Sequence, residues 1–366
     1  MKGKIEIVQF LRGVAALLVC FFHMKGILVF DGVPVGKYLF GSGSIGVPIF
    51  FMISGFIMVI TTRNSTPTIR YVGDFYLKRA IRIIPIYFLL TFFLIIAQGD
   101  LFVYVTKFAD RLISGLLFIP TYDNHIGPSY GMPPLKVGWS LNYEIFFYLL
   151  LGLSIFAGRH RWKVLSVAIL FLVVVVPIYT NGYVMTSLSE WYGYPFAYLS
   201  LITNPIIIYF LVGIWVGGIY QSNYSFVGVE VWNVLVVLLL GFFMAIYFGL
   251  LPFFRGYMWD LVVVGGLFFA IMMRNKQRPF NLSRPFVFIG DISYSLYLVH
   301  PIVLILLPQL LRTFNLGMLI VNPWCFFGVA PLILLFSWFS YYFLEQKMCS
   351  FLLKAIVLHK SKKKGE

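Results

Sequence analysis

Charged residues and cysteines are scarce in this sequence. Only 11% of its 366 residues are Asp, Glu, Lys or Arg, whereas an ordinary soluble domain has about 25%. The three cysteines, Cys20, Cys325 and Cys349, show no CxxC spacing and lie in or beside apolar segments. This pattern disfavours both a disulfide framework and a zinc site, so we expect no metal and interpret the cysteines as buried free thiols.

Long polar stretches are also lacking, which leaves no room for a soluble domain. The chain is 60% hydrophobic with a mean hydropathy of +0.91, and many apolar runs approach the ~20 residues that cross a bilayer. The first run is too long, and too polar at its end, for a signal peptide. We therefore predict an all-α, polytopic membrane helical bundle, with a membrane domain over residues 1–346 and a basic cytoplasmic tail over 347–366.

The apolar runs predict about ten transmembrane helices. We place them near residues 7–29, 45–61, 83–99, 138–157, 164–180, 196–219, 230–249, 258–273, 286–308 and 324–344. The apolar segment 112–119 is too short to cross the membrane, so we expect it to be re-entrant or interfacial.

Acidic residues are few, 13 against 28 lysines and arginines, which gives a net charge of +15. The basic residues cluster in short loops and in the tail, a pattern typical of topology signals and contacts to anionic membrane lipids rather than nucleic acid. With the N-terminus inside, twenty of them lie on the inner side and seven on the outer side, with Arg12 set apart. The positive-inside rule then predicts that both termini are cytoplasmic.

Two polar residues interrupt the first apolar run. Arg12 and His23 are eleven residues apart, which is close to three full helical turns, so a helix places both on one face roughly 16 Å apart. Such residues usually face an internal cavity. Arg12 can bind a phosphate or carboxylate, or anchor the helix at the inner interface. His23 is a candidate general base, or a histidine satisfied by a backbone carbonyl or by the outer headgroups.

A basic cluster precedes the third predicted span. Arg79 and Arg82 share a helical face through their three-residue spacing, and Lys78 is next to them. The three residues can clamp a phosphate-rich ligand, or they can serve only as a topology signal.

Glu144 lies near the outer end of a predicted span, where a carboxylate needs a partner or a wet cavity. It can orient His23, as a carboxylate orients the imidazole of a catalytic triad, or pair with a lysine such as Lys136.

Two further segments combine backbone breaks with polar side chains. Glycines from Gly41 to Gly46 and the pair Ser54–Gly55 allow close helix packing or a cavity-lining backbone. In the ninth predicted span, Asp291 or Ser293 can cap the helix. His300 there precedes Pro301, which frees a carbonyl in the preceding turn, and His300 is a weaker catalytic candidate than His23.

These segments, in this order, resemble acyltransferase family 3, an integral membrane family with a usual core of ten spans, and in particular its bacterial exopolysaccharide and O-antigen O-acyltransferases. The matching segments, spread from residue 11 to about 301, are LRGVAALLVCFFH, GVPIFFMISGF, FYLKRAIRIIP, GWSLNYEIFFY and DISYSLYLVHP. Arg12 and His23 fit the family's arginine–ten residues–histidine motif.

The resemblance implies an enzyme of the bacterial cytoplasmic membrane that transfers an acyl group, usually acetyl from acetyl-CoA, to a hydroxyl of a lipid-linked or polymeric glycan. It implies that His23 is the catalytic histidine, that Arg12 assists donor binding, and that Arg79 and Arg82, with Lys78, meet the coenzyme A phosphates. Glu144 matches the acidic position after the W-S-L element and joins the catalytic set. The candidates for substrate binding are Ser54, Trp139, Asn142 and His300.

The sequence departs from the family at one position, because many members carry an aspartate where Pro48 stands. Two other functions fit the composition. A transporter or flippase of lipid-linked glycans also needs many spans with intramembrane charges, although no internal repeat is visible here. An inactive scaffold subunit of an export complex would have no need for Arg12, His23 and Glu144.

Overall fold

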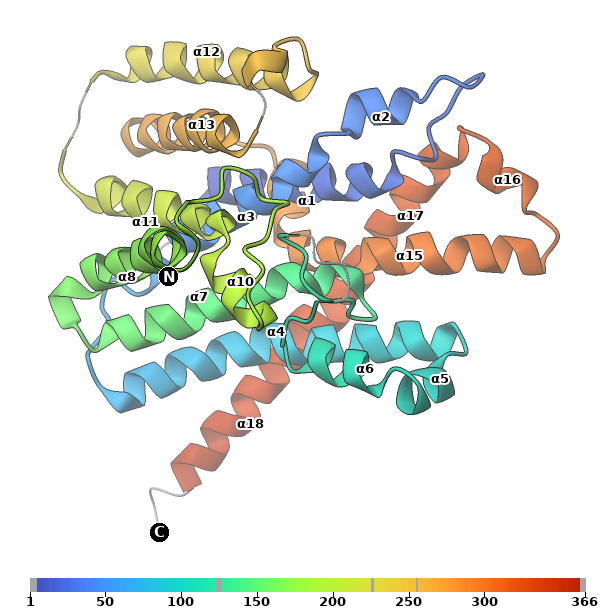
Figure 1. Cartoon of the computed structure of the whole chain (residues 1–366), viewed down its shortest axis with the longest axis horizontal. Coiled ribbons are helices and arrows are strands. Elements are labelled where there is room, and N and C mark those ends of the chain that lie inside the picture. Colours follow the sequence, from blue (N-terminus) through green and yellow to red (C-terminus); the bar gives the residue numbers. More distant parts are fainter. Residues whose placement is uncertain (1–4, 123–126, 225–226, 255, 363–366) are drawn as a thin grey trace.

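The computed structural model describes residues 5–122, 127–224, 227–254 and 256–362, which form a helical bundle (Figure 1). Five of the basic residues counted in the charge comparison lie outside the described residues: Lys2, Lys4, Arg255, Lys363 and Lys364. The α-helices of the described ranges are α1 (Glu6–Met24), α2 (Val35–Phe40), α3 (Gly46–Thr61), α4 (Ile69–Ala97), α5 (Leu101–Thr106), α6 (Ala109–Leu116), α7 (Trp139–Ile155), α8 (Arg161–Leu170), α9 (Val176–Asn181), α10 (Ala197–Thr203), α11 (Ile208–Gln221), α12 (Val229–Tyr247), α13 (Tyr257–Gln277), α14 (Arg284–Asp291), α15 (Ser293–Thr313), α16 (Met318–Val321), α17 (Cys325–Ser340) and α18 (Cys349–Lys362).

Short segments of other helix types join these elements. The 3₁₀ turns are η1 (Gly43–Ile45), η2 (Lys136–Gly138), η3 (Gly158–His160), η5 (Pro205–Ile207) and η6 (Pro252–Phe254). Two π-helical segments, η4 (Phe171–Val175) and η7 (Tyr341–Met348), continue α8 and α17. Within the described ranges, extended pairing is limited to an isolated bridge between Phe30 and Val33.

The helices confirm a multi-pass membrane protein of the all-α class. Eight described helical segments are long and apolar enough to cross a bilayer, and nine if the bent pair α10 and α11 counts as one span. The remaining expected span, 138–157, which is the fourth along the chain, corresponds to α7, whose 17 residues are at the lower limit of about 17–25 for a crossing helix. The segment expected not to cross, 112–119, overlaps the short helix α6.

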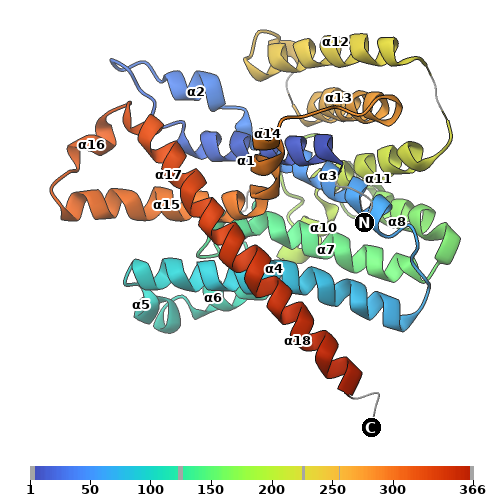
Figure 2. The same ribbon diagram turned by 180° about the vertical axis from the view of Figure 1, so that it is seen from behind.

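The long helices lie side by side, and α17 with α18 crosses behind them as one diagonal rod (Figures 1 and 2). Both views place the start of α1 and the end of α18 at the same end of the bundle. The basic tail expected from residue 347 is helical as far as Lys362.

The first expected span ends at Met24 rather than near residue 29, and three other expected spans differ more. The third begins at Ile69 rather than near residue 83, because Thr68 caps it by accepting a hydrogen bond from the Tyr71 amide and its polar first turns are helical too. The sixth bends by 44° between α10 and Pro205. The ninth is two helices, α14 and α15, that meet at Ile292, and the cap position of α15 is Ile292 rather than Asp291 or Ser293.

Glycines set the closest approach between helices. Gly55 of α3 faces the carbonyl of Phe210 in α11, and Gly213 of α11 faces the carbonyl of Met52, so a β-carbon at either glycine would collide with backbone. Small residues allow this approach in membranes, where van der Waals packing holds helices together. The Phe210 ring also stacks on Phe51 with a centroid distance of 4.5 Å. Gly46 likewise faces the carbonyl of Ala15 in α1. Gly46 and Gly55 of the second predicted span therefore allow close packing, whereas Gly41, before that span, lines a cavity.

The cysteines are free thiols, as predicted. Cys20 and Cys349 are buried and Cys325 is half-buried.

Candidate active site

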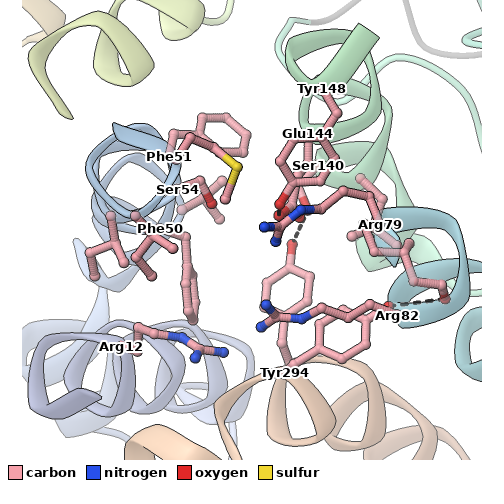
Figure 3. Close-up of a pocket in the computed structure, with 17 residues that line it drawn as sticks. Arg12, Phe50, Phe51, Ser54, Arg79, Arg82, Ser140, Glu144, Tyr148 and Tyr294 are labelled. Atoms are coloured by element: carbon pink, nitrogen blue, oxygen red, sulfur yellow. Dashed lines mark hydrogen bonds between the residues drawn. The ribbon is translucent and has the colours of Figure 1, made fainter. Parts of the chain in front are cut away.

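Three arginines from two helices point into one cavity of about 70 Å³ (Figure 3). We call it the arginine cavity. Arg12 enters from α1, and Arg79 and Arg82 enter from α4 on the opposite side. Glu144 and Tyr148 of α7 also line this cavity (Figure 3). Because one buried water needs about 10–15 Å³ by this measure, the cavity has room for one small group.

Local packing explains how the arginines reach the cavity. The short helix α14 crosses α1 where Gly290 lies against the backbone of Gln9 and Gly13 lies against Gly290. This crossing fixes α1 next to Arg12, whose Nη1 donates to Oε1 of Gln9 at 3.2 Å. On α4, the three-residue spacing of Arg79 and Arg82 directs both side chains to the same face.

Carboxylates offset part of this positive charge. Tyr148 donates its hydroxyl hydrogen to Glu144, and Arg82 interacts electrostatically with Glu144 and Glu345. The Arg79 guanidinium lies 5.3 Å from the centre of the Tyr148 ring, and its buried Nε has no hydrogen-bond partner among the described residues. A buried donor without a partner is costly, so the arginine cavity is suited to an anionic ligand.

His23, at the C-terminal end of α1, lines a second, larger cavity of about 930 Å³. We call it the histidine chamber. His23 is exposed within it. Its lining combines aromatic side chains with polar ones, including Tyr38, Trp139, Lys37 and Asp260. A chamber of this volume and composition matches the small-molecule sites of proteins, about 300–1,000 Å³ with a few convergent polar groups.

The two cavities share a wall. Val47 and Tyr297 line both of them. The Tyr297 hydroxyl oxygen lies 2.7 Å from Oγ of Ser140 and 3.2 Å from the carbonyl oxygen of Val137, so α15 is tied to the start of α7 at this wall. Arg12 and His23, which the spacing predicts on one face, thus line neighbouring cavities on either side of Tyr297.

His23 has a histidine neighbour. Nδ1 of His23 lies 2.8 Å from the carbonyl oxygen of Val19 and 3.3 Å from Nε2 of His300. The His300 side chain is fully buried, and its own Nδ1 lies 3.0 Å from the carbonyl oxygen of Leu296. The carbonyl bond expected under the non-catalytic interpretation of His23 is therefore present, but it occupies only one ring nitrogen.

The structure does not bring Glu144 and Lys78 to the places that the sequence predicts for them. Glu144 lies in the arginine cavity and has Tyr148, not His23, as its hydrogen-bond partner. Lys78 is exposed and does not line either cavity, because adjacent helical residues point about 100° apart. Lys78 therefore lies apart from the cavity that Arg79 and Arg82 line.

The four candidates for substrate binding occupy four places. Ser54 lines the arginine cavity and Trp139 lines the histidine chamber. Asn142 is buried at a separate small cavity of about 10 Å³, and His300 is buried beside His23. Asn142 and His300 thus have no surface in either of the two larger cavities.

Sequence reasoning missed Tyr294, Tyr297 and Asp260. Tyr294, Tyr297 and His300 recur at intervals of three residues, which places them along one face of α15, so the segment SYSLYLVHP carried a usable signal. Asp260 gave no comparable signal, because its place in the histidine chamber depends on how α13 packs.

The comparisons with known proteins decide the family. The model of the acyltransferase domain of acyltransferase family 3 matches residues 5–342. The chain belongs to this family. It is an acyltransferase. Pro48, where many members carry an aspartate, lines the histidine chamber.

Two relatives are similar over most of their length. The exopolysaccharide production protein ExoZ of Rhizobium meliloti (strain 1021) is 30% identical over 278 residues, which cover 75% of this chain and 80% of ExoZ. The putative acetyltransferase ORF330 of Acidianus two-tailed virus is 26% identical over 300 residues, which cover 79% of this chain and 80% of that protein. No solved structure matches the chain.

Proposed function

We propose that this acyltransferase transfers an acyl group, acetyl by default, from acyl-CoA to a hydroxyl of a cell-surface glycan, with His23 as the general base. The observation that carries the proposal is the shared wall: a chamber that exposes a histidine adjoins a cavity that collects three guanidinium groups. One cavity has the chemistry to hold an anionic donor, and the other has the base that an incoming hydroxyl requires.

The donor side fits an acyl-CoA. Coenzyme A carries several phosphates, and guanidinium groups bind phosphate through paired charge-assisted hydrogen bonds. Arg12, Arg79 and Arg82 supply such groups, and the unpartnered Nε of Arg79 supplies a donor that a ligand would satisfy. The volume of about 70 Å³ holds one small group, so the rest of the donor extends beyond the cavity.

The acceptor side fits a sugar. A pyranose ring has apolar faces and a rim of hydroxyls, and the histidine chamber offers aromatic side chains such as Trp139 together with polar groups such as Asp260. The name of ExoZ, an exopolysaccharide production protein, supports a polysaccharide or its lipid-linked precursor as the acceptor. Membrane lipids surround the bundle in this proposal.

The chemistry needs one proton acceptor and one leaving group. The glycan hydroxyl oxygen attacks the thioester carbonyl carbon while its proton passes to Nε2 of His23. The C–S bond then breaks, and His23 returns the proton to the departing thiolate, which leaves an ester and a free thiol. Hydrogen-bond donors at the developing oxyanion would lower the barrier.

The same proposal places the enzyme in the bacterial cytoplasmic membrane with both termini inside. The excess of basic residues in the loops assigned to the inner side supports this orientation, and α1 begins at the end of the bundle where α18 ends (Figures 1 and 2). The domain division at residue 346 is part of the proposal. A C-terminal alkaline phosphatase fusion should be inactive and a C-terminal green fluorescent protein fusion should fluoresce. The reverse pattern would contradict the orientation.

The function is tested by substitution of His23. His23→Ala should abolish glycan acylation while expression and membrane insertion stay normal, because the hydroxyl loses its proton acceptor. Mass spectrometry of the host's surface polysaccharide should then lose the increment of ~42 Da that acetylation of a hydroxyl adds. His160→Ala is the matched control, since His160 lies in the exposed turn η3 away from both cavities. Full acylation by His23→Ala would remove His23 as the base.

A further inference from the structure

His300 lies directly behind His23 with respect to the histidine chamber. The two ring centres are 5.0 Å apart. His23 is exposed to the chamber, whereas His300 has no exposed surface and lines neither of the two larger cavities. His300 on α15 therefore has no direct access to either substrate. Any functional role of its imidazole must act through the contact with His23 on α1.

The backbone partners fix the tautomers of both rings. A carbonyl oxygen only accepts hydrogen bonds, so Nδ1 of His300 must carry the hydrogen that it donates to Leu296, and its Nε2 is then a lone-pair acceptor when the ring is neutral. By the same reasoning, Nδ1 of His23 carries a hydrogen toward the carbonyl of Val19. That hydrogen is shared with Nε2 of His300 at 3.3 Å. Nε2 of His23 is left unprotonated.

We propose that His300 is a positioning residue that, together with the Val19 carbonyl, orients the His23 ring, and that it stabilises the protonated form of His23. When Nε2 of His23 gains a proton, the positive charge spreads to its Nδ1–H, and the lone pair of His300 accepts a stronger, charge-assisted hydrogen bond. No proton needs to leave His23 through His300. The inference rests on the proposed function, in which His23 is the base.

His300 has the same position relative to His23 that the carboxylate has relative to the histidine of a catalytic triad. That carboxylate orients the imidazole and stabilises the imidazolium. Glu144 was the expected candidate for that place, but it lines the arginine cavity on the other side of Tyr297 and is bound by Tyr148. Among the described residues, the polar atoms within hydrogen-bond distance of Nδ1 of His23 are the Val19 carbonyl and Nε2 of His300.

The test distinguishes the effect of the hydrogen-bond acceptor at position 300 from the effect of the side-chain volume there. His300→Gln keeps an acceptor oxygen near the position of Nε2, whereas His300→Phe keeps a ring and removes the acceptor. His300→Phe should lower kcat roughly 10- to 100-fold, the loss expected for a hydrogen bond to a charged group, with KM for acyl-CoA and glycan unchanged. His300→Gln should recover most of that loss. His300→Asn, which is polar but too short, should behave like His300→Phe and provides the test if the latter misfolds.

A second readout does not depend on acyl transfer. Diethyl pyrocarbonate modifies unprotonated imidazole nitrogens, and the rate at His23 can be followed by peptide mass spectrometry against His160 in the same protein. At a pH where His23 is partly protonated, His300→Phe should speed modification of His23, because the protonated ring loses its acceptor, and His300→Gln should slow it again. Equal rates and equal kcat in wild type and His300→Phe would overturn the inference, as would equal losses in His300→Gln and His300→Phe. A different outcome would overturn the proposed function alone. In that outcome the His300 variants change the labelling of His23 as expected, but His23→Ala remains active.

Discussion

Tyr297 and Ser140 are joined by a hydrogen bond of 2.7 Å between their hydroxyl oxygens, and this bond lies in the wall that separates the arginine cavity from the histidine chamber. Ser140 also reaches the carbonyl oxygen of Val137, at 3.1 Å, as Tyr297 does at 3.2 Å. The Tyr297 ring is buried and packs edge-on against Phe50. Tyr297 and Val47 therefore border both cavities, and under the proposed function they lie between the donor and the acceptor.

The first prediction concerns this wall. In the proposed mechanism the acyl end of the donor meets the glycan hydroxyl at the shared wall, so Tyr297→Ala, which removes the ring and joins the two cavities, leaves the thioester open to water. Hydrolysis of acyl-CoA without acceptor should then rise several-fold. Tyr297→Phe keeps the ring and loses only the hydroxyl bonds, so its hydrolysis should stay near the wild-type rate. Release of free thiol from acetyl-CoA measures both. Equal hydrolysis in wild type and Tyr297→Ala would show that the wall does not shield the donor.

The second prediction concerns the arginine cavity. The double variant Arg79→Ala, Arg82→Ala should raise KM for acyl-CoA at least about 10- to 100-fold, the loss expected for one charge-assisted hydrogen bond to the donor, and it should leave KM for the glycan nearly unchanged. Lys78→Ala is the matched control on the same helix, since Lys78 is exposed and outside the cavity. An unchanged KM for acyl-CoA in the double variant would place the donor elsewhere.

The sequence predicted the class of fold and the first helix well, because both depend on local features. Apolar length marks a span whatever it packs against, and the eleven-residue spacing of Arg12 and His23 follows from helical geometry. Breaks inside apolar runs were harder to locate. The apolar run from 286 to 308 was predicted as one span although Asp291 and Ser293 flank the break at Ile292. The crossing of α14 with α1 at Gly13 and Gly290 accompanies that break.

The relation of His23 to Glu144 and His300 could not be predicted, because it depends on tertiary packing. Glu144 and His23 both lie toward the outer ends of their predicted spans, which suggested a triad. The rotation of α7 instead directs Glu144 into the arginine cavity, where its hydrogen-bond partner is Tyr148, one turn along the same helix. His300 was expected at the substrate and instead lies behind the catalytic candidate, since its position on α15 faces α1. A residue's depth along a helix is readable from sequence, whereas its rotation toward a particular neighbour is not.

The third prediction concerns the acceptor. Asp260 lines the histidine chamber, and a carboxylate there can accept hydrogen bonds from sugar hydroxyls. Asp260→Asn retains the shape but weakens these bonds, so KM for the glycan should rise by about tenfold, consistent with the loss of one charge-assisted bond, while KM for acyl-CoA stays constant. Steady-state kinetics with each substrate varied in turn provide the measurement. A rise in both constants would indicate a general structural defect.

The fourth prediction concerns the packing that holds the two cavities in place. Gly213→Ala puts a methyl group against the Met52 carbonyl in α3, whereas Gly218→Ala, on the same helix α11, puts it into open space. The first should destabilise the fold by about 1–3 kcal/mol, the range for overpacking, and the second should leave stability unchanged. Thermal unfolding in detergent, followed by the loss of monodisperse protein on size exclusion, compares the two. Because α3 also carries Val47 of the shared wall, Gly213→Ala should also raise donor hydrolysis. Equal melting temperatures for the two variants would show that α3 and α11 separate without cost.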